Sequence, residues 1–218
     1  MNHRHVTLVI TLLGSSLWAQ QKTMPAPTTT RPLETRVARY EDPQREAWQK
    51  PNEVVAAFKL KKTDVVADIG AGTGYFSRRF ARVVPKGKVY AVDIAADILE
   101  WLRNKAAEEK ITNIETILSK EDDPMLPPNS VNLVFICDAA HHITNRPALY
   151  KKLAAATKKG GRMAILDFPP DLPDRPHPPE ELIPREQSIK EADEAGFQFV
   201  EELKIPGRQY FLLFKKKS

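Results

Sequence analysis

A glycine-rich turn beside a carboxylate is the clearest chemical signal in this chain. Alternating glycines from Gly70 to Gly74 follow a short apolar run, and Asp68 stands two residues before the first of them. Glycine lets a ligand approach the backbone closely. The spacing is G-x-G-x-G, whereas a dinucleotide-binding turn has G-x-G-x-x-G, and Tyr75 occupies that last position. A carboxylate at this place would repel a pyrophosphate and attract a cationic ligand.

A strand, a turn and a helix are expected to position these groups. The segment 65–69 is apolar and rich in β-branched residues, which is typical of a buried strand that the glycines end. From 76 to 84, apolar residues recur at helical spacing among arginines. In an open α/β sheet this order holds a nucleotide-like ligand at the carboxyl end of the strand. A second expected strand, 88–93, ends in Asp93, which is placed to accept hydrogen bonds from vicinal hydroxyls.

The strings DIGAGTGYF and KVYAVDI resemble motif I and the acidic loop of class I S-adenosylmethionine-dependent methyltransferases. The resemblance implies that Asp68 faces the cationic methionine end of the cofactor, S-adenosyl-L-methionine, and that Asp93 takes both ribose hydroxyls. The N–H groups at the start of the following helix would meet the methionine carboxylate. A plain glycine turn in an unrelated α/β domain is the alternative. The cofactor-binding residues expected on this basis are Asp68, Gly70, Ala71, Gly72, Gly74, Tyr75, Asp93, Ile94, Asp122 and Asp138.

The loop after the third expected strand, 114–118, resembles the acidic loop that contacts adenine in this family. The resemblance makes Asp122 the polar partner of the adenine amino group, with Glu121 and Asp123 as alternatives. Asn132 stands where the family usually has an aspartate. Because it lies at the start of the fourth strand, away from the carboxyl end, we expect little effect on function.

Two adjacent histidines follow the fourth expected strand, 133–137. Asp138, His141 and His142 lie beyond its carboxyl end, where the ligand crevice of such a sheet opens. Imidazole, with an ordinary pKa of roughly 6.5, suits proton removal near neutral pH. His142 is the candidate base or substrate contact, a structural histidine is the alternative, and the catalytic residue stays unassigned. No carboxylate and histidine set with ligand spacing accompanies the pair, so no metal site is predicted.

The loop after the fourth expected strand excludes several classes of methyl acceptor. The string CDAAHH lacks the Asn/Asp-Pro-Pro-aromatic turn of methyltransferases that act on adenine amino groups or glutamine amides. Cys137 does not follow a proline, as the nucleophile of cytosine-carbon enzymes does, and a single cysteine is too few for arsenic methylation. Cys137 is expected to be an inert core residue.

The N-terminus predicts a processed or anchored segment. Residues 1–21 combine Arg4, an apolar run and small residues before a cleavage point after Ala19, as in a signal peptide or N-terminal anchor. We expect an exported protein, periplasmic or secreted, if the signal is genuine, and otherwise a cytoplasmic or membrane-associated one. Export would separate the protein from S-adenosylmethionine, which is made in the cytoplasm. Residues 22–39, rich in proline and threonine, are expected to form a linker before a methyltransferase domain over 40–218.

Composition is consistent with one domain. The chain has 218 residues, 42% of them hydrophobic, and one cysteine, which excludes an internal disulfide framework. The net charge of +5 is spread among interspersed charges of both signs, and Lys215–Lys217 predicts a solvated tail rather than a nucleic-acid or membrane patch. The mature chain is expected to have no integral membrane span.

The expected fold is a three-layer α/β/α, Rossmann-like sandwich. The resemblance implies a seven-stranded, mostly parallel sheet, and 197–203 with 209–214 reads as its antiparallel C-terminal edge pair. A fifth parallel strand is expected over 162–168. Six prolines in 169–179 exclude regular structure there, and the segment is a candidate substrate lid or an irregular surface insertion. Trp48 is predicted to be a core anchor rather than a cofactor contact.

These observations predict an enzyme that transfers the sulfonium methyl group to an oxygen, nitrogen or carbon of a small molecule, lipids and quinone-like rings included. The lack of nucleic-acid motifs excludes a nucleic acid as the expected partner, and the oligomeric state is left open. One alternative is a module that binds S-adenosylmethionine without transferring the methyl group. A nicotinamide-dependent oxidoreductase is the other, and the glycine spacing and Asp68 disfavour it.

Overall fold

The computed structural model describes residues 31–205 and 207–218. The expected signal segment, 1–21, and the first part of the expected linker, 22–30, lie outside the described residues. Among those that are described, no helix combines the length and the apolar character needed to cross a bilayer.

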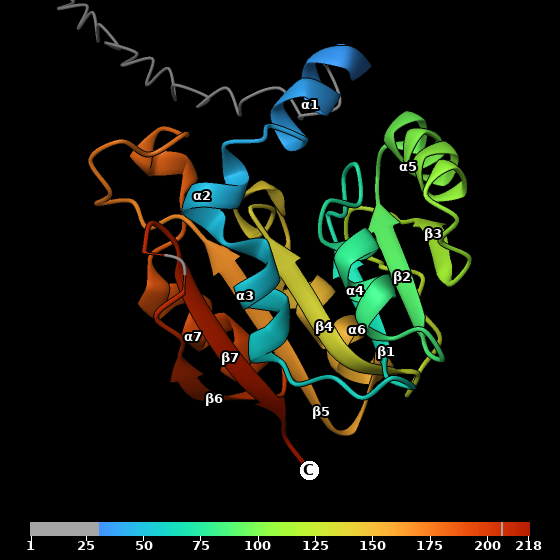
Figure 1. Cartoon of the computed structure of the whole chain (residues 1–218). Coiled ribbons are helices and arrows are strands. Elements are labelled where there is room, and N and C mark those ends of the chain that lie inside the picture. Colours follow the sequence, from blue (N-terminus) through green and yellow to red (C-terminus); the bar gives the residue numbers. More distant parts are fainter. Residues whose placement is uncertain (1–30, 206) are drawn as a thin grey trace, which may run out of the picture.

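A seven-stranded sheet in the order β3-β2-β1-β4-β5-β7-β6 forms the centre of the molecule (Figure 1). The five parallel strands are β1 (Val65–Ile69), β2 (Lys88–Asp93), β3 (Ile114–Leu118), β4 (Val131–Cys137) and β5 (Thr157–Asp167). The antiparallel edge pair is β6 (Phe197–Glu202) and β7 (Tyr210–Lys216). The predicted fold class is confirmed. The strand order reverses between β1 and β4, and a crevice opens at such a switch point.

Helices cover both faces of the sheet and account for its apolar strands. On one face, α3 (Pro51–Ala57) and α4 (Ser77–Val83) pack around Phe58, whose ring lies 5.8 Å from Phe135 and 5.5 Å from Phe211 between centroids. On the other, α6 (Arg146–Ala156) and α7 (Arg185–Glu194) cover β4, β5 and β7. The helix α5 (Ala96–Glu108) packs on β2 and β3 on the same face as α4, where its Leu102 lies against Ala91. Strands buried on both faces read as continuous apolar runs, and this is why the sequence located them.

Two short helices lie at the carboxyl ends of the parallel strands, α1 (Leu33–Tyr40) and α2 (Arg45–Gln49) (Figure 1). Residues 33–39, which the sequence prediction placed in the linker, are thus helical. The buried Arg36 pairs with Asp97 in the first turn of α5 and ties α1 to the domain. That partner is distant in sequence, so the linker composition gave no sign of it.

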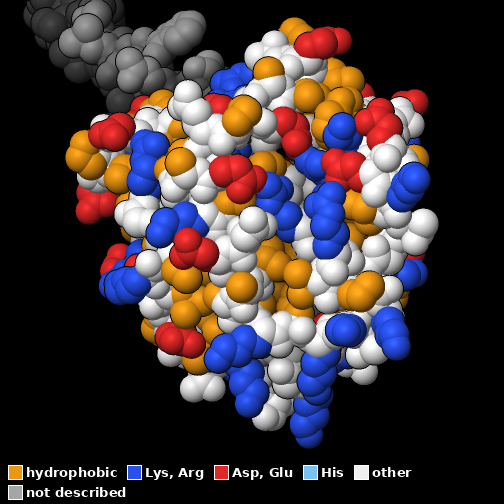
Figure 2. Space-filling view, viewed as in Figure 1, with side chains coloured by type: hydrophobic (Ala, Val, Ile, Leu, Met, Phe, Trp, Pro, Cys, Tyr) orange, Lys and Arg blue, Asp and Glu red, His pale blue; other side chains and the backbone are white. Residues whose placement is uncertain are grey.

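Two lysine-bearing segments also differ from expectation. β5 begins at Thr157 rather than at 162, and it contains Gly160 (φ +75°) and a register shift opposite β4. Lys215 and Lys216 belong to β7, and Lys216 Nζ donates to the carbonyl of Thr157 across 2.6 Å. Lys215 and Lys216 are therefore part of the sheet rather than of a tail, while Lys215 and Lys217 are exposed, as expected. Figure 2 shows Lys and Arg side chains gathered at the end of the molecule opposite α1.

The proline-rich segment 169–179 contains neither helix nor strand up to the short 3-10 helix η3 (Pro179–Glu181), as predicted. It follows Phe168, whose ring lies 5.7 Å from that of Trp48 between centroids. Trp48 thus packs α2 onto the end of β5, but it is half-buried rather than part of the core. One residue of this segment, His177, is buried.

Candidate functional site

The glycine turn leaves β1 at the switch point of the sheet. Gly70, Gly72 and Gly74 have φ of +69°, +54° and +73°, a left-handed region that other residues rarely adopt. The N–H groups of Gly70 and Ala71 both donate to the Val92 carbonyl, so the turn is fastened to β2. A Cβ at position 70 would lie 2.5 Å from that of Ala139, in the loop after β4. Glycine here lets the loops after β1 and β4 touch.

The two carboxylates expected to hold the cofactor lie on either side of this turn. Asp68 is buried and accepts a 2.5 Å hydrogen bond from Ser77 Oγ, and its burial raises its pKa to about 7. Asp93 accepts from the N–H of Gly72 across 2.8 Å and from that of Ala95 across 3.0 Å. Burial raises the pKa of Asp93, although these N–H donors oppose the change. Each Asp93 oxygen keeps a further lone pair with which to accept from a hydroxyl.

Tyr40, the last residue of α1, covers the turn. Its ring would come within 3.1 Å of a Cβ added at Gly72. Burial and, after it, the negative charge of Asp93 raise the pKa of the Tyr40 phenol. Sequence reasoning did not single out this residue, because a lone tyrosine before a helical stretch carries no motif.

The adenine side of the expected site is apolar and open. Ile94, which directly follows Asp93, is 48% exposed. Asp122 and Glu121 are exposed, whereas Asp123 accepts a 2.9 Å hydrogen bond from Lys152 Nζ. Of the three acidic candidates, Asp123 is therefore engaged within the protein.

Tyr75 has a packing role that its motif position did not indicate. Its ring lies between the guanidinium groups of Arg45 and Arg79, whose central carbons are 3.9 and 4.0 Å from the ring centroid. Its hydroxyl donates to Glu46 across 3.1 Å. Its side chain therefore joins α2 to α4.

Asp138 combines a left-handed backbone conformation with a buried carboxylate oxygen that has no partner in the described part of the chain. Its φ is +51°, which is unusual for a residue with a side chain, while its N–H donates to the Leu166 carbonyl. The buried Asp138 Oδ1 has no hydrogen-bond partner among the described residues, and nor does Thr73 Oγ1 in the glycine turn. Burial, followed by the charge of Asp167, raises the pKa of Asp138 to about 6. Unpaired buried oxygens on both loops suit a ligand that donates hydrogen bonds.

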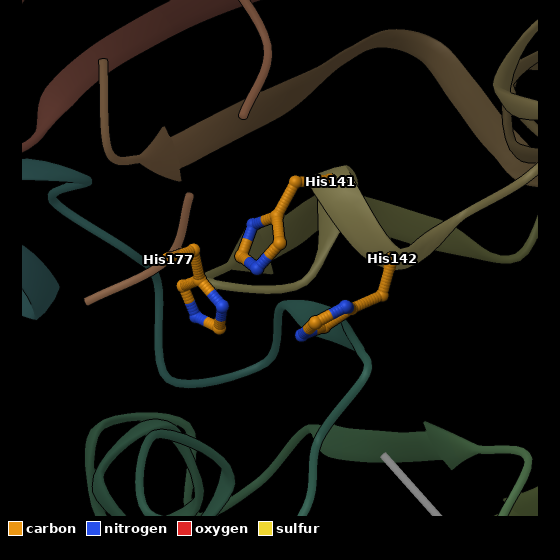
Figure 3. Close-up of side chains that lie close together, drawn as sticks. All are labelled: His141, His142 and His177. Atoms are coloured by element: carbon orange, nitrogen blue, oxygen red, sulfur yellow. The ribbon is translucent and has the colours of Figure 1, made fainter. Parts of the chain in front are cut away.

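Three histidines converge beside Asp138 (Figure 3). His141 and His142 belong to the 3-10 helix η2 (Ala140–His142), and His177 comes from the proline-rich segment. The ring centroid of His141 lies 4.0 Å from that of His142 and 4.5 Å from that of His177. Sequence reasoning named the first two but missed His177, since nothing in its proline-rich surroundings tied it to β4.

The three rings differ in basicity. Desolvation by the surrounding groups lowers the pKa of His142 to about 3, although part of this residue stays exposed, and burial lowers that of His177 to about 4. The neighbouring His141 adds to both effects. Burial also lowers the pKa of His141, but the charge and the 2.8 Å hydrogen bond of Asp167 outweigh it, and the net shift is upward. His142, the candidate base, is thus a weak one. His141, oriented by a carboxylate, is better suited to accept a proton.

The donor set fits S-adenosylmethionine. Asp68 and Asp138 offer carboxylates to a cationic end, Asp93 offers acceptors to hydroxyls, and Ile94 offers an apolar surface to a base. The turn between them presents backbone without side chains. The resemblance assigned these roles to Asp68, to Asp93 and to the turn, whereas those of Asp138 and Ile94 follow from the structure.

Comparison with known proteins points the same way. Residues 66–161 match the family model described as "Methyltransferase domain". The ubiquinone/menaquinone biosynthesis C-methyltransferases of Hahella chejuensis and Neisseria meningitidis serogroup C are 31% and 34% identical over 105 and 110 residues, or 47% and 50% of this chain. The chain covers 42% and 44% of their length, less than half of these curated relatives.

Solved structures share the fold over most of the chain. A S-adenosylmethionine-dependent methyltransferase from Aquifex aeolicus superposes with a TM-score of 0.79 at 24% identity, covering 84% of this chain and 97% of that one. The cyclase SpnF superposes with a TM-score of 0.68 at 13% identity, covering 78% of this chain and 80% of that one. The second likeness shows that this architecture alone does not define one reaction.

Residues 66–161, which run from β1 into β5, match the methyltransferase domain model, and they contain the glycine turn, Asp68, Asp93 and the tandem histidines. Over the rest of the chain the solved structures show a shared fold.

Proposed function

We propose that this protein is an enzyme that transfers a methyl group from S-adenosylmethionine to an oxygen, nitrogen or activated carbon of a small molecule. One observation carries the proposal: Asp68 and Asp93 lie on either side of a glycine turn at the switch point of the sheet. Asp93 would hold the ribose hydroxyls, Ile94 would pack on adenine and Asp122 would accept from its amino group. When bound, S-adenosylmethionine supplies an electrophilic methyl group on a sulfur that leaves uncharged.

The protein's own task is then alignment and proton removal. Alignment of reacting groups can contribute about 7–11 kcal/mol. Tyr40 covers the turn and would exclude water from that side. His141, whose Nδ1 is held by Asp167, presents Nε2 as the proton acceptor for a nucleophile that carries a proton.

A quinone-like ring is the acceptor class that we favour. The relatives in Hahella and Neisseria are named as C-methyltransferases of ubiquinone and menaquinone biosynthesis. The segment that matches the methyltransferase domain model, 66–161, contains the loop after β4. Methylation of a ring carbon releases a proton, for which His141 is placed as the base. The exported location suggested by residues 1–21 is retained as part of the proposal, supported by the pattern of that segment alone.

Calorimetric titration with S-adenosylmethionine tests cofactor binding. Asp93→Ala should weaken affinity by about tenfold to a hundredfold, because hydrogen bonds from hydroxyls to a carboxylate contribute about 1.5–3 kcal/mol. The matched control is Glu115→Ala, which removes an exposed carboxylate of β3 that pairs with Lys88. Equal affinity in the unaltered chain and in Asp93→Ala would contradict the assignment.

Incubation with methyl-labelled S-adenosylmethionine and quinone-like phenols tests transfer. We expect labelled product from the unaltered chain and markedly less from His141→Ala. Tight cofactor binding without labelled product from phenols or from small-molecule extracts would favour the alternative of a binding module. Thermal stabilisation by a nicotinamide cofactor in place of S-adenosylmethionine would favour the oxidoreductase.

A further inference from the structure

The histidine cluster joins two segments that are distant in the chain. His141 and His142 lie at the carboxyl end of β4, and His177 reaches them from the proline-rich segment after β5. One ring nitrogen from each lies within 4.8 Å of the other two. Figure 3 shows the three rings turned toward one another. Convergence of three imidazoles is uncommon as plain packing, because these rings carry polar atoms that burial leaves in need of partners.

One of these nitrogens is a buried atom without a partner. The His141 side chain is 0% exposed, and its Nε2 has no hydrogen-bond partner among the described residues. The other nitrogen, Nδ1, is 2.8 Å from Asp167 Oδ1, and this carboxylate is itself buried. A carboxylate that holds one histidine nitrogen while the other points into a cluster is the usual outer shell of a metal-binding histidine.

Acidic groups outnumber basic ones around the cluster. Asp138 Oδ1 lies 4.0 Å from His177 Nε2, Glu181 Oε2 lies 3.7 Å from His177 Nδ1, and Asp167 holds His141. Arg39 is the opposing cation, with its guanidinium 3.1 Å from His177 Nε2. Within 4.0 Å of these imidazoles three carboxylates face one guanidinium, while Arg31 and Arg45 act from farther away, and this local balance favours an added positive charge.

We propose that His141, His142 and His177 form a binding site for a divalent transition-metal ion of the zinc type. Neutral imidazole nitrogens suit zinc and its neighbours in the first transition series better than magnesium or calcium, which prefer oxygen. Three histidine ligands with a fourth position left to water or substrate is a known arrangement for zinc. Small shifts of the exposed His142 ring would close the distances.

Metal binding would require Arg39 to lose its hydrogen bond to His177. An imidazole that binds a metal through one nitrogen carries a proton on the other, so His177 could then no longer accept from Arg39. Metal binding therefore breaks the contact between α1 and the proline-rich segment, and removal of Arg39 should strengthen binding.

The proposed metal site lies next to the expected cofactor site, so a bound metal could take part in the proposed function. Ala139, two residues before His141, is the residue that Gly70 contacts, so the cluster borders the cofactor loop. Resting on that function, a metal bound here would occupy His141 Nε2, the proton acceptor of the metal-free enzyme, and its open position would instead bind an oxygen of the methyl acceptor in deprotonated form. Metal binding itself does not depend on the function, and it can be measured without cofactor or acceptor.

The test is a Zn²⁺ titration of the whole chain, without a polyhistidine tag, in competition with a chromophoric chelator. We expect one Zn²⁺ per chain, and Co²⁺ in its place should give visible d–d absorption. His142→Ala, which changes an exposed residue and should preserve the fold, and His177→Ala should each weaken affinity by at least about tenfold. Arg39→Ala should strengthen it several-fold.

The chain offers a matched control. Its five histidines are the three of the cluster together with His3 and His5, so a His3→Ala/His5→Ala variant retains the whole proposed site. This variant should bind Zn²⁺ as the unaltered chain does. Absence of stoichiometric binding, or binding lost in the control and kept in His142→Ala and His177→Ala, would overturn the proposal whatever the outcome of the methylation assays.

Discussion

Ser77 Oγ lies 2.5 Å from Asp68 Oδ2 and donates a hydrogen bond to it, joining the first residue of α4 to the strand that precedes the glycine turn. Both residues are buried. Burial raises the pKa of Asp68 to about 7, and the hydrogen bond from Ser77 only partly offsets the effect. This carboxyl is therefore poised between its neutral and charged forms near neutral pH.

The raised pKa makes stability depend on pH. Between about pH 4 and 7 the folded chain keeps a proton on Asp68 that the unfolded chain releases, so this contribution to stability is complete below pH 4 and falls as pH rises to 7. Between pH 5 and pH 7.5 we expect the free energy of unfolding of the unaltered chain to fall by about 2–3 kcal/mol more than that of Asp68→Asn, which cannot ionise at this position. Urea unfolding of both proteins at both pH values measures this difference. Parallel curves would show that Asp68 ionises normally.

The same carboxyl should link cofactor affinity to pH. If the cationic end of S-adenosylmethionine meets Asp68, binding favours the charged form and releases the proton that burial holds there. Affinity should therefore rise about tenfold between pH 5.5 and 7.5. Calorimetry in two buffers of different ionisation enthalpy counts the released protons. Asp68→Asn should release none from this position, and an unchanged proton count in that variant would refute the link.

The sequence predicts the parts of the fold and of the site that depend on local patterns, and it does not predict those that depend on contacts between distant segments. Asp68, the glycine turn and Asp93 could be found because each follows a strand whose apolar residues mark it locally, and parallel strands bring their ends together. Burial on both faces likewise made β1, β2 and β4 readable. Tyr75 shows the limit of a motif, since its ring is held by Arg45 and Arg79 through packing that the motif does not encode.

His177 and Arg36 could not have been placed in this way. Their partners, His141 and Asp97, are reached through irregular or N-terminal segments, and no periodicity sets the path of such segments. The weakness of His142 as a base is of the same kind. It arises from desolvation by the surrounding groups and from the two neighbouring rings, of which one comes from the distant segment.

Substitution of Gly70, compared with that of Gly160, distinguishes the cost of backbone strain from the cost of steric crowding. Gly70→Ala would put a residue with a side chain at φ +69° and its Cβ 2.5 Å from that of Ala139. Gly160→Ala, the control, has a similar φ of +75° and no heavy atom within 4 Å of the new Cβ. The control should lose about 1–2 kcal/mol of stability, and Gly70→Ala about 1–3 kcal/mol more because Ala139 must move. Thermal unfolding gives both values, and similar losses would mean that the contact between the loops is unimportant.

Arg78 is the last test, because it connects three segments around the glycine turn. Its guanidinium donates to Glu41, before α2, across 2.6 Å, and to Glu109, at the end of α5, across 2.5 Å. The Arg78 side chain is 8% exposed, so Arg78→Met leaves two glutamates facing each other without their main cation. Loss of one partner of a buried ion pair costs about 3–5 kcal/mol, and partial exposure of both glutamates reduces the expectation to about 2–3 kcal/mol.

Arg82 is the matched control for this substitution. It also pairs with Glu109, but its side chain is 55% exposed, so Arg82→Met should change stability by less than about 1 kcal/mol. Urea unfolding at pH 7 compares the two variants with the unaltered chain. Burial raises the pKa of Glu109, but Arg78 and Arg82 together outweigh it and lower this pKa. The loss of stability in Arg78→Met should therefore shrink at acid pH, because a protonated glutamate no longer needs the cation. A loss independent of pH would indicate that Arg78 acts through the packing of its aliphatic stem rather than through its charge.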